Sequence, residues 1–281
     1  MGTTAHLLAS GAGWSVCDIV CGAGPHDRPF EEQHEDICIA AVTQGTFQYR
    51  SRQGSAVLAP GALLLGNAGT CFECGHEHGT GDRCLAFHFA PEHLETVMAN
   101  VPGARRTAFT LPHLPPSPAL MPLIAEAEAA RDDGDGTALE ELSLRLAGAV
   151  AAALAGSNGA VRRPTWRDER RVTAALRRIE ANAHDQPHAT LALADLAREA
   201  ATSPYHFLRI FRQLVGMTPH QFVLRTRLHR AAVRLRRSDE TISAIAFDAG
   251  FNDLSTFNRR FRRLMGASPG AYRARGRHSA G

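Results

Sequence analysis

Apolar residues recur with a helical spacing in two segments of the last third of the chain, 203–219 and 253–269. In both segments they fall at i, i+4 and i+7: Phe207, Phe211 and Leu214 in the first, and Phe257, Phe261 and Leu264 in the second. This spacing predicts one amphipathic helix in each segment. Two copies are too few for a solenoid, so we predict two copies of one small module.

A second, shorter apolar pattern precedes each of these helices. Residues 193–200 match residues 242–249 at an offset of 49, whereas the later helices match at an offset of 50. The second turn is therefore one residue longer, and it contains Gly250, which can adopt a left-handed conformation at little cost. A short helix, a turn and a second helix form the helix-turn-helix unit, whose second helix can lie in the major groove of DNA.

Start and stop signals bound the two longer helices, and a further helix is predicted between the modules. Ser203 before Pro204 is a start signal, and Gly216 and Gly266 are stop signals. The connecting helix would run from about 219 to 236. Its apolar stripe is spaced i, i+4, i+7 and i+11: Leu224, Leu228, Ala231 and Leu235.

The pattern of residues 14–90 predicts short β-strands separated by turns. Six strands are predicted, at 37–42, 46–50, 55–58, 62–65, 70–74 and 84–90, with turn signals between them. Many short strands at regular spacing indicate an antiparallel barrel or sandwich. Two helices, at 118–131 and 137–155, are predicted after the strands. The second carries an apolar stripe: Leu139, Leu142, Leu146, Val150 and Leu154.

These patterns predict an α+β chain with two domains. A β-barrel is expected at 1–115 and a helical pair at 116–156. A Gly- and Ser-rich linker is expected at 157–167, and an all-α domain with two helix-turn-helix units at 168–281.

Charge is divided unequally between the two halves. Residues 161–281 carry 23 arginines and 10 acidic residues, a formal net charge of +13, whereas residues 1–160 carry 8 arginines and 18 acidic residues, a net charge of −10. A basic all-α domain is typical of a protein that binds the phosphate backbone. Helical hairpins with solvated arginine faces are the alternative, and this division of charge argues against it.

The C-terminal segment resembles the AraC/XylS-type bacterial transcription regulators, over roughly residues 168–275. The second module carries the longer set of matching residues: Ile245, Ala246, Gly250, Phe251, Phe257, Arg259, Phe261, Arg262, Gly266, Ser268, Pro269, Tyr272 and Arg273. The first module carries a shorter set: Leu196, Ala197, Ser203, Pro204, Phe207, Arg209, Phe211, Gly216 and Pro219. The resemblance implies two reading helices that enter successive major-groove segments of promoter DNA, about 34 Å apart.

The first half resembles the cupin-like effector domain of the same family more weakly. The resemblance rests on Val42 and Gly45, and on Gly54 followed by Pro60 and Gly61. It implies a small-molecule effector in the barrel, RNA polymerase as a partner and a homodimer paired through the helices at 116–156. The stripe on the second of these helices has another explanation, because it could pack on its own domain.

The outward residues one turn into each reading helix are the candidates for base recognition. They are Tyr205, Leu208 and Arg209 in the first module, and Ser255, Asn258 and Arg259 in the second. Arginine can pair with guanine and asparagine with adenine. Ser203, Arg212, Arg262, Arg263 and the arginines of the connecting helix are assigned to phosphate. For Arg209 and Arg259, a phosphate contact or an intramolecular ion pair is the alternative.

A cluster of cysteine and histidine occurs late in the predicted barrel. Cys71, Cys74, His76, His78 and Cys84 have spacings at which thiol and imidazole groups can hold one Zn²⁺. A thiol-based sensor and a cysteine-based alkyl-transfer or DNA-repair protein fused to the DNA-binding domain are alternatives. Buried strand cysteines beside a surface loop would also explain the pattern. No other cofactor is expected.

Neither catalysis nor membrane insertion is expected. Enzymatic cupins hold a metal through an early His-x-His, and here only His34 stands at that position. No run of about 18 apolar residues occurs, and no basic segment followed by an apolar run opens the chain. We therefore expect a non-enzymatic regulator that works in the cytoplasm.

Overall fold

The computed structural model describes residues 2–24, 26–27, 29–76, 81–104, 107–156, 164–185, 191–215 and 217–278. The chain divides into two compact units, Met1–Arg162 and Arg163–Gly281. The first part of the predicted linker, 157–163, lies outside the described residues. Residues 164–167, which the prediction placed in the linker, belong to the second unit, and a helix begins there at Trp166.

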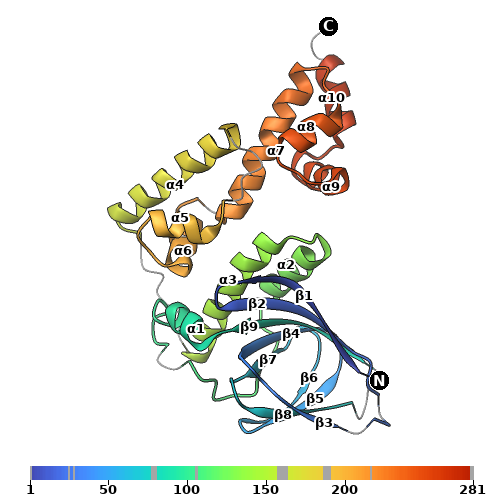
Figure 1. Cartoon of the computed structure of the whole chain (residues 1–281), viewed down its shortest axis with the longest axis vertical. Coiled ribbons are helices and arrows are strands. Elements are labelled where there is room, and N and C mark those ends of the chain that lie inside the picture. The colour runs from blue at the N-terminus through green and yellow to red at the C-terminus, as the bar shows by residue number, and fades with distance from the viewer. Residues whose placement is uncertain are drawn as a thin grey trace. The chain divides into compact units, whose positions relative to one another are not determined.

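Two antiparallel sheets form the first unit (Figure 1). The six-stranded sheet has the order β1 (Thr3–Gly11), β2 (Trp14–Cys21), β9 (Asp82–Phe89), β4 (Ile37–Gly45), β7 (Leu63–Gly66) and β10 (His113–Leu114). The four-stranded sheet has the order β3 (Phe30–Gln33), β8 (Cys71–Gly75), β5 (Phe47–Ser51) and β6 (Gly54–Leu58). The six predicted strands are therefore present, and β1, β2, β3 and β10 were missed.

Apolar side chains from both sheets meet in one core. The cluster consists of Cys38, Ala40, Val42, Phe47, Tyr49, Leu58, Ala62, Leu64, Cys84 and Ala86. Along β4 and β9 these residues are spaced two apart, because successive strand side chains point to opposite faces. Every second residue of β4 and β9 therefore points into this core.

In the described part of the first unit, three helices follow β9: α1 (Pro91–Met98), α2 (Met121–Asp132) and α3 (Gly136–Leu154). The predicted pair corresponds to α2 and α3, whereas α1 was missed. Asp135 caps α3, since its carboxylate accepts a hydrogen bond from the Ala138 amide. Leu139, Leu142, Leu146 and Val150 on α3 are buried, and α3 packs against α1, α2 and β1 within its own unit. Most of the apolar stripe therefore packs inside the unit, and subunit pairing through these helices stays a prediction.

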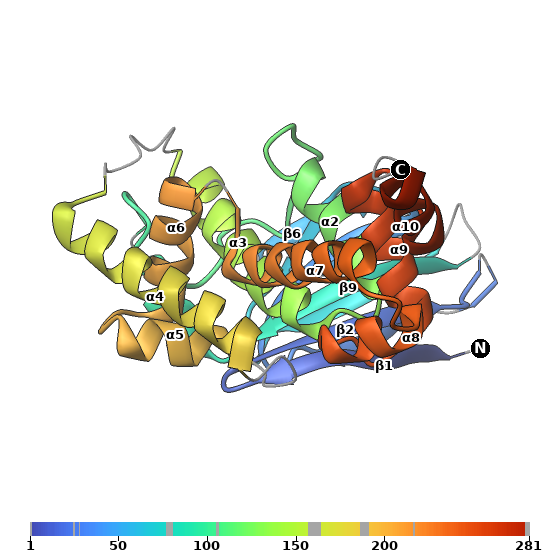
Figure 2. The ribbon, with the colours of Figure 1, turned by 90° about the horizontal axis from the view of Figure 1, so that it is seen from above.

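Seven helices form the described part of the second unit. They are α4 (Trp166–Asp185), α5 (Leu193–Glu199), α6 (Pro204–Val215), α7 (Pro219–Arg237), α8 (Ile242–Asp248), α9 (Leu254–Met265) and α10 (Pro269–His278). Figures 1 and 2 show α4, α5 and α6 grouped at one end of α7, and α8, α9 and α10 at the other. The connecting helix α7 has almost the predicted bounds. It begins with a capping box formed by Thr218 and Gln221.

Phenylalanines form the centre of both helix-turn-helix units. Phe207 and Phe211 on α6 have ring centroids 5.7 Å apart, and Phe257 and Phe261 on α9 have centroids 5.4 Å apart. All four side chains are fully buried. Leu228, Ala231 and Leu235 of the α7 stripe pack into the second of these cores. Among the described residues, no helix has the length and apolar character needed to cross a bilayer.

Candidate nucleic-acid interface

The second reading helix, α9, is bounded by signals in its own sequence. The Asp253 carboxylate accepts a hydrogen bond from the Thr256 amide at 2.7 Å, which satisfies one of the free amides at the helix start. Gly266 ends the helix in the left-handed conformation at φ 71°. Gly216, the corresponding residue after α6, lies outside the described residues.

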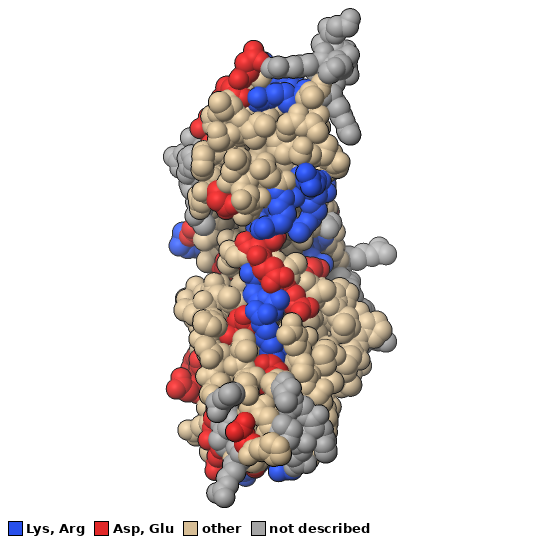
Figure 3. All heavy atoms as spheres, turned by 90° about the vertical axis from the view of Figure 1, so that its right-hand side faces the viewer, with Lys and Arg blue, Asp and Glu red and all other residues tan. Residues whose placement is uncertain are grey.

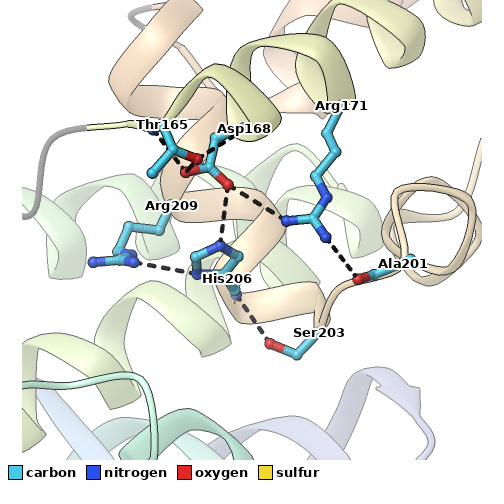
Figure 4. Close-up of polar contacts among 7 residues, drawn as sticks. All are labelled: Thr165, Asp168, Arg171, Ala201, Ser203, His206 and Arg209. Carbon is cyan, nitrogen blue, oxygen red and sulfur yellow. Dashed lines mark hydrogen bonds and ion pairs between the residues drawn. The ribbon is translucent and has the colours of Figure 1, made fainter.

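The first reading helix, α6, begins in a polar network with α4 (Figure 4). Ser203 caps α6, because its hydroxyl accepts a hydrogen bond from the His206 amide at 3.3 Å. The buried Asp168 carboxylate of α4 accepts hydrogen bonds from the Thr165 amide at 2.9 Å and the Thr165 hydroxyl at 2.8 Å. The Nε2 of His206 lies 3.6 Å from Asp168 Oδ1. One carboxylate therefore caps α4 and contacts α6.

Two arginines extend this network, one through Asp168 and the other through His206. Arg171 contacts the Asp168 carboxylate at 3.5 Å and donates to the Ala201 carbonyl at 3.3 Å. Arg209 donates to Nδ1 of His206 at 3.2 Å. Because arginine can only donate, the His206 proton must lie on Nε2, which faces Asp168. The orientation of Arg209, a candidate base reader, is thereby tied to α4.

Competing effects set the pKa values in this network. Burial raises the pKa of Asp168, but the hydrogen bonds from Thr165 and the nearby His206 outweigh burial and lower its pKa below the ordinary value. Burial and the charge on Arg209 lower the pKa of His206. The ionised carboxylate and the neutral imidazole are therefore the favoured forms near neutral pH.

The turn of each helix-turn-helix unit contains one residue in the left-handed conformation, but the residue type differs between the two turns. Gly250 has φ 82° in the second turn, and the matching residue of the first turn, Ala201, has φ 49°. Ala201 is the one residue other than glycine with a positive φ among the described residues. A Cβ atom in this conformation is unfavourable, so the first turn carries backbone strain that the second avoids.

The outward residues of the two reading helices differ in exposure. Ser255, Asn258 and Arg259 on α9 are exposed, as predicted. On α6, Tyr205 and Arg209 are half-buried. Leu208 is only 2% exposed in the whole chain, and its role in base recognition stays a prediction.

The arginines predicted to contact phosphate separate into two groups. Arg212, Arg262 and Arg263 are exposed on α6 and α9, and Figure 3 shows arginines gathered in groups on the second unit. On α7, Arg234 instead pairs with Glu240 and Asp248. Arg236 of the same helix lies over the Tyr272 ring, 4.6 Å from its centroid. Arg234 and Arg236 therefore have partners within the second module, and the assignment of the α7 arginines to phosphate stays a prediction.

A basic groove between α4 and α5 was not predicted. It has a volume of about 410 Å³, and its lining includes Arg167, Arg170 and Arg171. The sequence does contain one signal that indicates where α4 begins. Thr165 and Asp168 stand three residues apart, as in a capping box, at a helix start.

Polar and aromatic side chains meet inside the barrel of the first unit. His34 Nε2 lies 3.0 Å from the Tyr49 hydroxyl, and the His34 ring stacks on Phe72 with centroids 4.1 Å apart. Burial, together with the nearby His88, lowers the pKa of His34 to about 4. Gly66 permits this packing, because a Cβ there would lie 2.3 Å from the His34 ring. These residues form a packed aromatic and hydrogen-bonded cluster in the barrel core.

The predicted zinc cluster is not assembled as expected. Cys71 and Cys74 stand three apart on β8 and so point to opposite faces, which leaves Cys71 exposed. His78 lies outside the described residues. The structure instead brings His76 within reach of Cys21 and Asp82, and Cys84 donates to Asp82 Oδ1 at 3.6 Å. Cys21 and Asp82 were missed because they come from separate strands.

Family comparisons cover both units. A family model described as an AraC-like ligand binding domain matches residues 20–147, and one described as a helix-turn-helix domain matches residues 196–275.

Individual relatives match mainly in the second unit. The chain is 41% identical over 81 residues to an HTH-type transcriptional regulator of Mycobacterium tuberculosis, covering 29% of this chain and 31% of the relative. It is 33% identical over 103 residues to the MmsAB operon regulatory protein of Pseudomonas aeruginosa, covering 37% and 34%. The chain thus spans about a third of the length of these relatives. A crystal structure of an AraC-type transcriptional regulator from Chromobacterium violaceum matches with 27% identity and a TM-score of 0.35, covering 38% of this chain and 93% of that one.

Proposed function

The chain belongs to the AraC-type family of helix-turn-helix regulators, and from this membership we propose that it is a sequence-specific, DNA-binding transcription regulator. Its second unit binds promoter DNA through α6 and α9, and its first unit binds a small-molecule effector. The observation that carries this proposal is the pair of helix-turn-helix units, each with a buried phenylalanine core, joined by one continuous helix, α7.

Charge and exposure on α9 support DNA binding. Arg259 and Asn258 are exposed one turn into the helix, with Arg262 and Arg263 exposed one turn further on. This order gives base-edge donors and acceptors first and phosphate-binding cations next, as a helix in the major groove requires. Arg209 on α6 is the corresponding candidate in the first module, held by His206.

The barrel core supports an effector role for the first unit. In this core His34 and Tyr49 form a hydrogen-bonding pair beside the Phe72 ring. Such an interior can enclose a small ligand that carries both apolar and hydrogen-bonding groups.

The barrel's chemistry favours binding over catalysis. Burial raises the pKa values of the Cys74 and Cys84 thiols, which disfavours the nucleophilic thiolate that alkyl transfer needs. We therefore propose a non-enzymatic protein that acts on promoter DNA in the bacterial cytoplasm.

RNA polymerase and a second copy of the chain are further proposed partners, by family analogy alone. Because most of the α3 stripe packs inside the first unit, we propose that self-association uses other residues of the chain. Sedimentation of the full chain over a range of concentrations tests this point: a concentration-dependent dimer supports pairing, and a monomer throughout contradicts it.

Selection of bound sequences from a random DNA library tests the proposed function. The full chain should enrich one motif with two conserved segments about one helical turn apart. Binding to the enriched motif should fall steeply as salt rises, because phosphate contacts release counterions. Enrichment of no motif would contradict sequence-specific binding. The Phe257→Ala variant is the control, because it should lose the α9 core and with it the enrichment.

A further inference from the structure

Three metal-binding side chains converge at one end of the barrel. Cys21 is the last residue of β2, Asp82 is the first residue of β9, and these two residues are direct partners across the strands. His76 follows β8 at once. The Sγ of Cys21, a ring nitrogen of His76 and a carboxylate oxygen of Asp82 all lie within 4.8 Å of one another.

The backbone holds this end of the barrel in place. The amide of Gly81, the residue before β9, donates to the Ala23 carbonyl, just after β2, at 2.8 Å. The His76 ring packs against Phe47 with centroids 6.0 Å apart. Two of the donors therefore lie at the ends of paired strands, and the third is in ring contact with β5.

The hydrogen bonds leave one side of the Asp82 carboxylate facing the cluster. The Cys84 thiol donates to Oδ1 at 3.6 Å, while Oδ2 lies 2.6 Å from His76 Nε2. A partner of this kind orients a carboxylate ligand, as outer-shell groups do around protein metals. A buried His–Asp pair would explain the 2.6 Å contact by itself, but it does not explain the third donor, the Cys21 thiol.

The burial of these three side chains and the types of their donor atoms indicate which metal ion they would bind. The side chains of His76 and Asp82 are 2% and 7% exposed, and Cys21 is also buried. Thiolate, imidazole and carboxylate are the donors that Zn²⁺ takes, whereas Mg²⁺ and Ca²⁺ prefer oxygen alone. Tetrahedral zinc needs such donors about 3.3–3.6 Å apart, so small side-chain movements suffice.

We propose that Cys21, His76 and Asp82 form a site for one Zn²⁺ ion, with water in the fourth position. Binding releases the Cys21 thiol proton to solvent and leaves a thiolate on the metal. Of the ligands in the zinc cluster predicted from the sequence, this site contains only His76. It stands independently of DNA binding, because all of its residues belong to the first unit.

Titration of the reduced, metal-free full chain with Zn²⁺, against a chromophoric chelator, tests the proposal. One Zn²⁺ should bind per chain, and Cys21→Ser should weaken binding at least about tenfold. Cys71→Ser is the matched control, since it removes an exposed thiol from β8 outside the site. It should bind as the unchanged chain does.

Co²⁺ gives a second readout. The unchanged chain and Cys71→Ser should show a thiolate-to-cobalt charge-transfer band, and Cys21→Ser should lose it. Circular dichroism checks folding. If Cys21→Ser is unfolded, Asp82→Asn, which keeps the shape of the side chain, should show the same loss of zinc affinity. Absence of stoichiometric zinc binding, or equal binding by the unchanged chain and a folded site variant, would overturn the proposal.

Discussion

The two helix-turn-helix units share one apolar core but position their reading helices differently. Phe207 and Phe211 match Phe257 and Phe261 in burial and ring contact. The start of α9 is capped by its own Asp253, whereas the start of α6 also depends on Asp168, from a helix that precedes the module. The shared core therefore fixes the fold, and the contacts at the helix starts fix how each helix is presented.

Matching residues of the two reading helices differ between the modules in identity and in exposure. Asn258 is exposed on α9, while Leu208, in the same position on α6, is buried. Arg209 and Arg259 are shared, but Arg209 contacts His206. A chain with two unlike reading surfaces should bind an asymmetric site.

The largest predicted effect tests whether the two cores are equivalent. Phe207→Ala and Phe257→Ala should each destabilise their module by about 3–5 kcal/mol, since each leaves a large cavity in a closed core. Hydrogen exchange of the full chain, followed in α6 and α9 separately, measures both modules in one sample. A large loss of protection for one variant and almost none for the other would show that the cores are not equivalent.

The next largest predicted effect is a difference in stability between variants at the starts of the two reading helices, α6 and α9. Asp168→Ala should cost about 1–3 kcal/mol, because Thr165, Arg171 and His206 lose a buried partner. Asp253→Ala should cost less, since the amide freed at an exposed helix start can bond water. Denaturant unfolding of both variants measures the difference, and a greater loss in Asp253→Ala would contradict this assignment.

The Asp168 carboxylate should also make the stability of the folded chain depend on pH, and the lowered pKa sets the sign of this dependence. The pKa of Asp168 is lowered in the folded chain, so its contribution to stability is present above its ordinary value of 3.8 and is lost as pH falls below it. The unchanged chain should therefore lose more stability on acidification through this range than Asp168→Ala does. Parallel acid-unfolding curves for the two proteins would refute the prediction.

The smallest effect concerns the turns. Ala201→Gly should stabilise the first module by up to about 1 kcal/mol, because glycine removes the strain of the left-handed alanine. The gain is limited because glycine also raises the conformational entropy of the unfolded chain. Gly250→Ala should destabilise the second module by about 1 kcal/mol for the opposite reason. Thermal unfolding of both variants checks the opposite signs, and a shift in the same direction for both would contradict the matched roles of these residues.

Local signals in the sequence account for most of the second unit. The bounds of α6, α7 and α9 were predicted closely because apolar periodicity and capping residues are short-range features. The contact between Asp168 and His206 was missed, because it joins residues 38 positions apart with no pattern between them. Strand β1 was missed because most of its residues are exposed, which leaves no buried face to alternate with a polar one.

The cysteine cluster shows a different kind of error. The spacing of Cys71 and Cys74 suggests a shared ligand site, but three residues along a strand place side chains on opposite faces. Cys21 and Asp82 lie far apart in sequence and meet only through the pairing of β2 with β9. A site made by strand pairing cannot be found from spacing within one strand.

Base-by-base binding profiles of Arg209→Ala and Arg259→Ala test the central claim of two unlike reading helices most directly. Each variant of the full chain is measured against every single-base change in the selected site. Each should weaken specific binding by about 1–3 kcal/mol and relax preference at its own position, with the two positions about one helical turn apart. An equal loss on all sequences, or relaxation at the same base in both variants, would contradict the account.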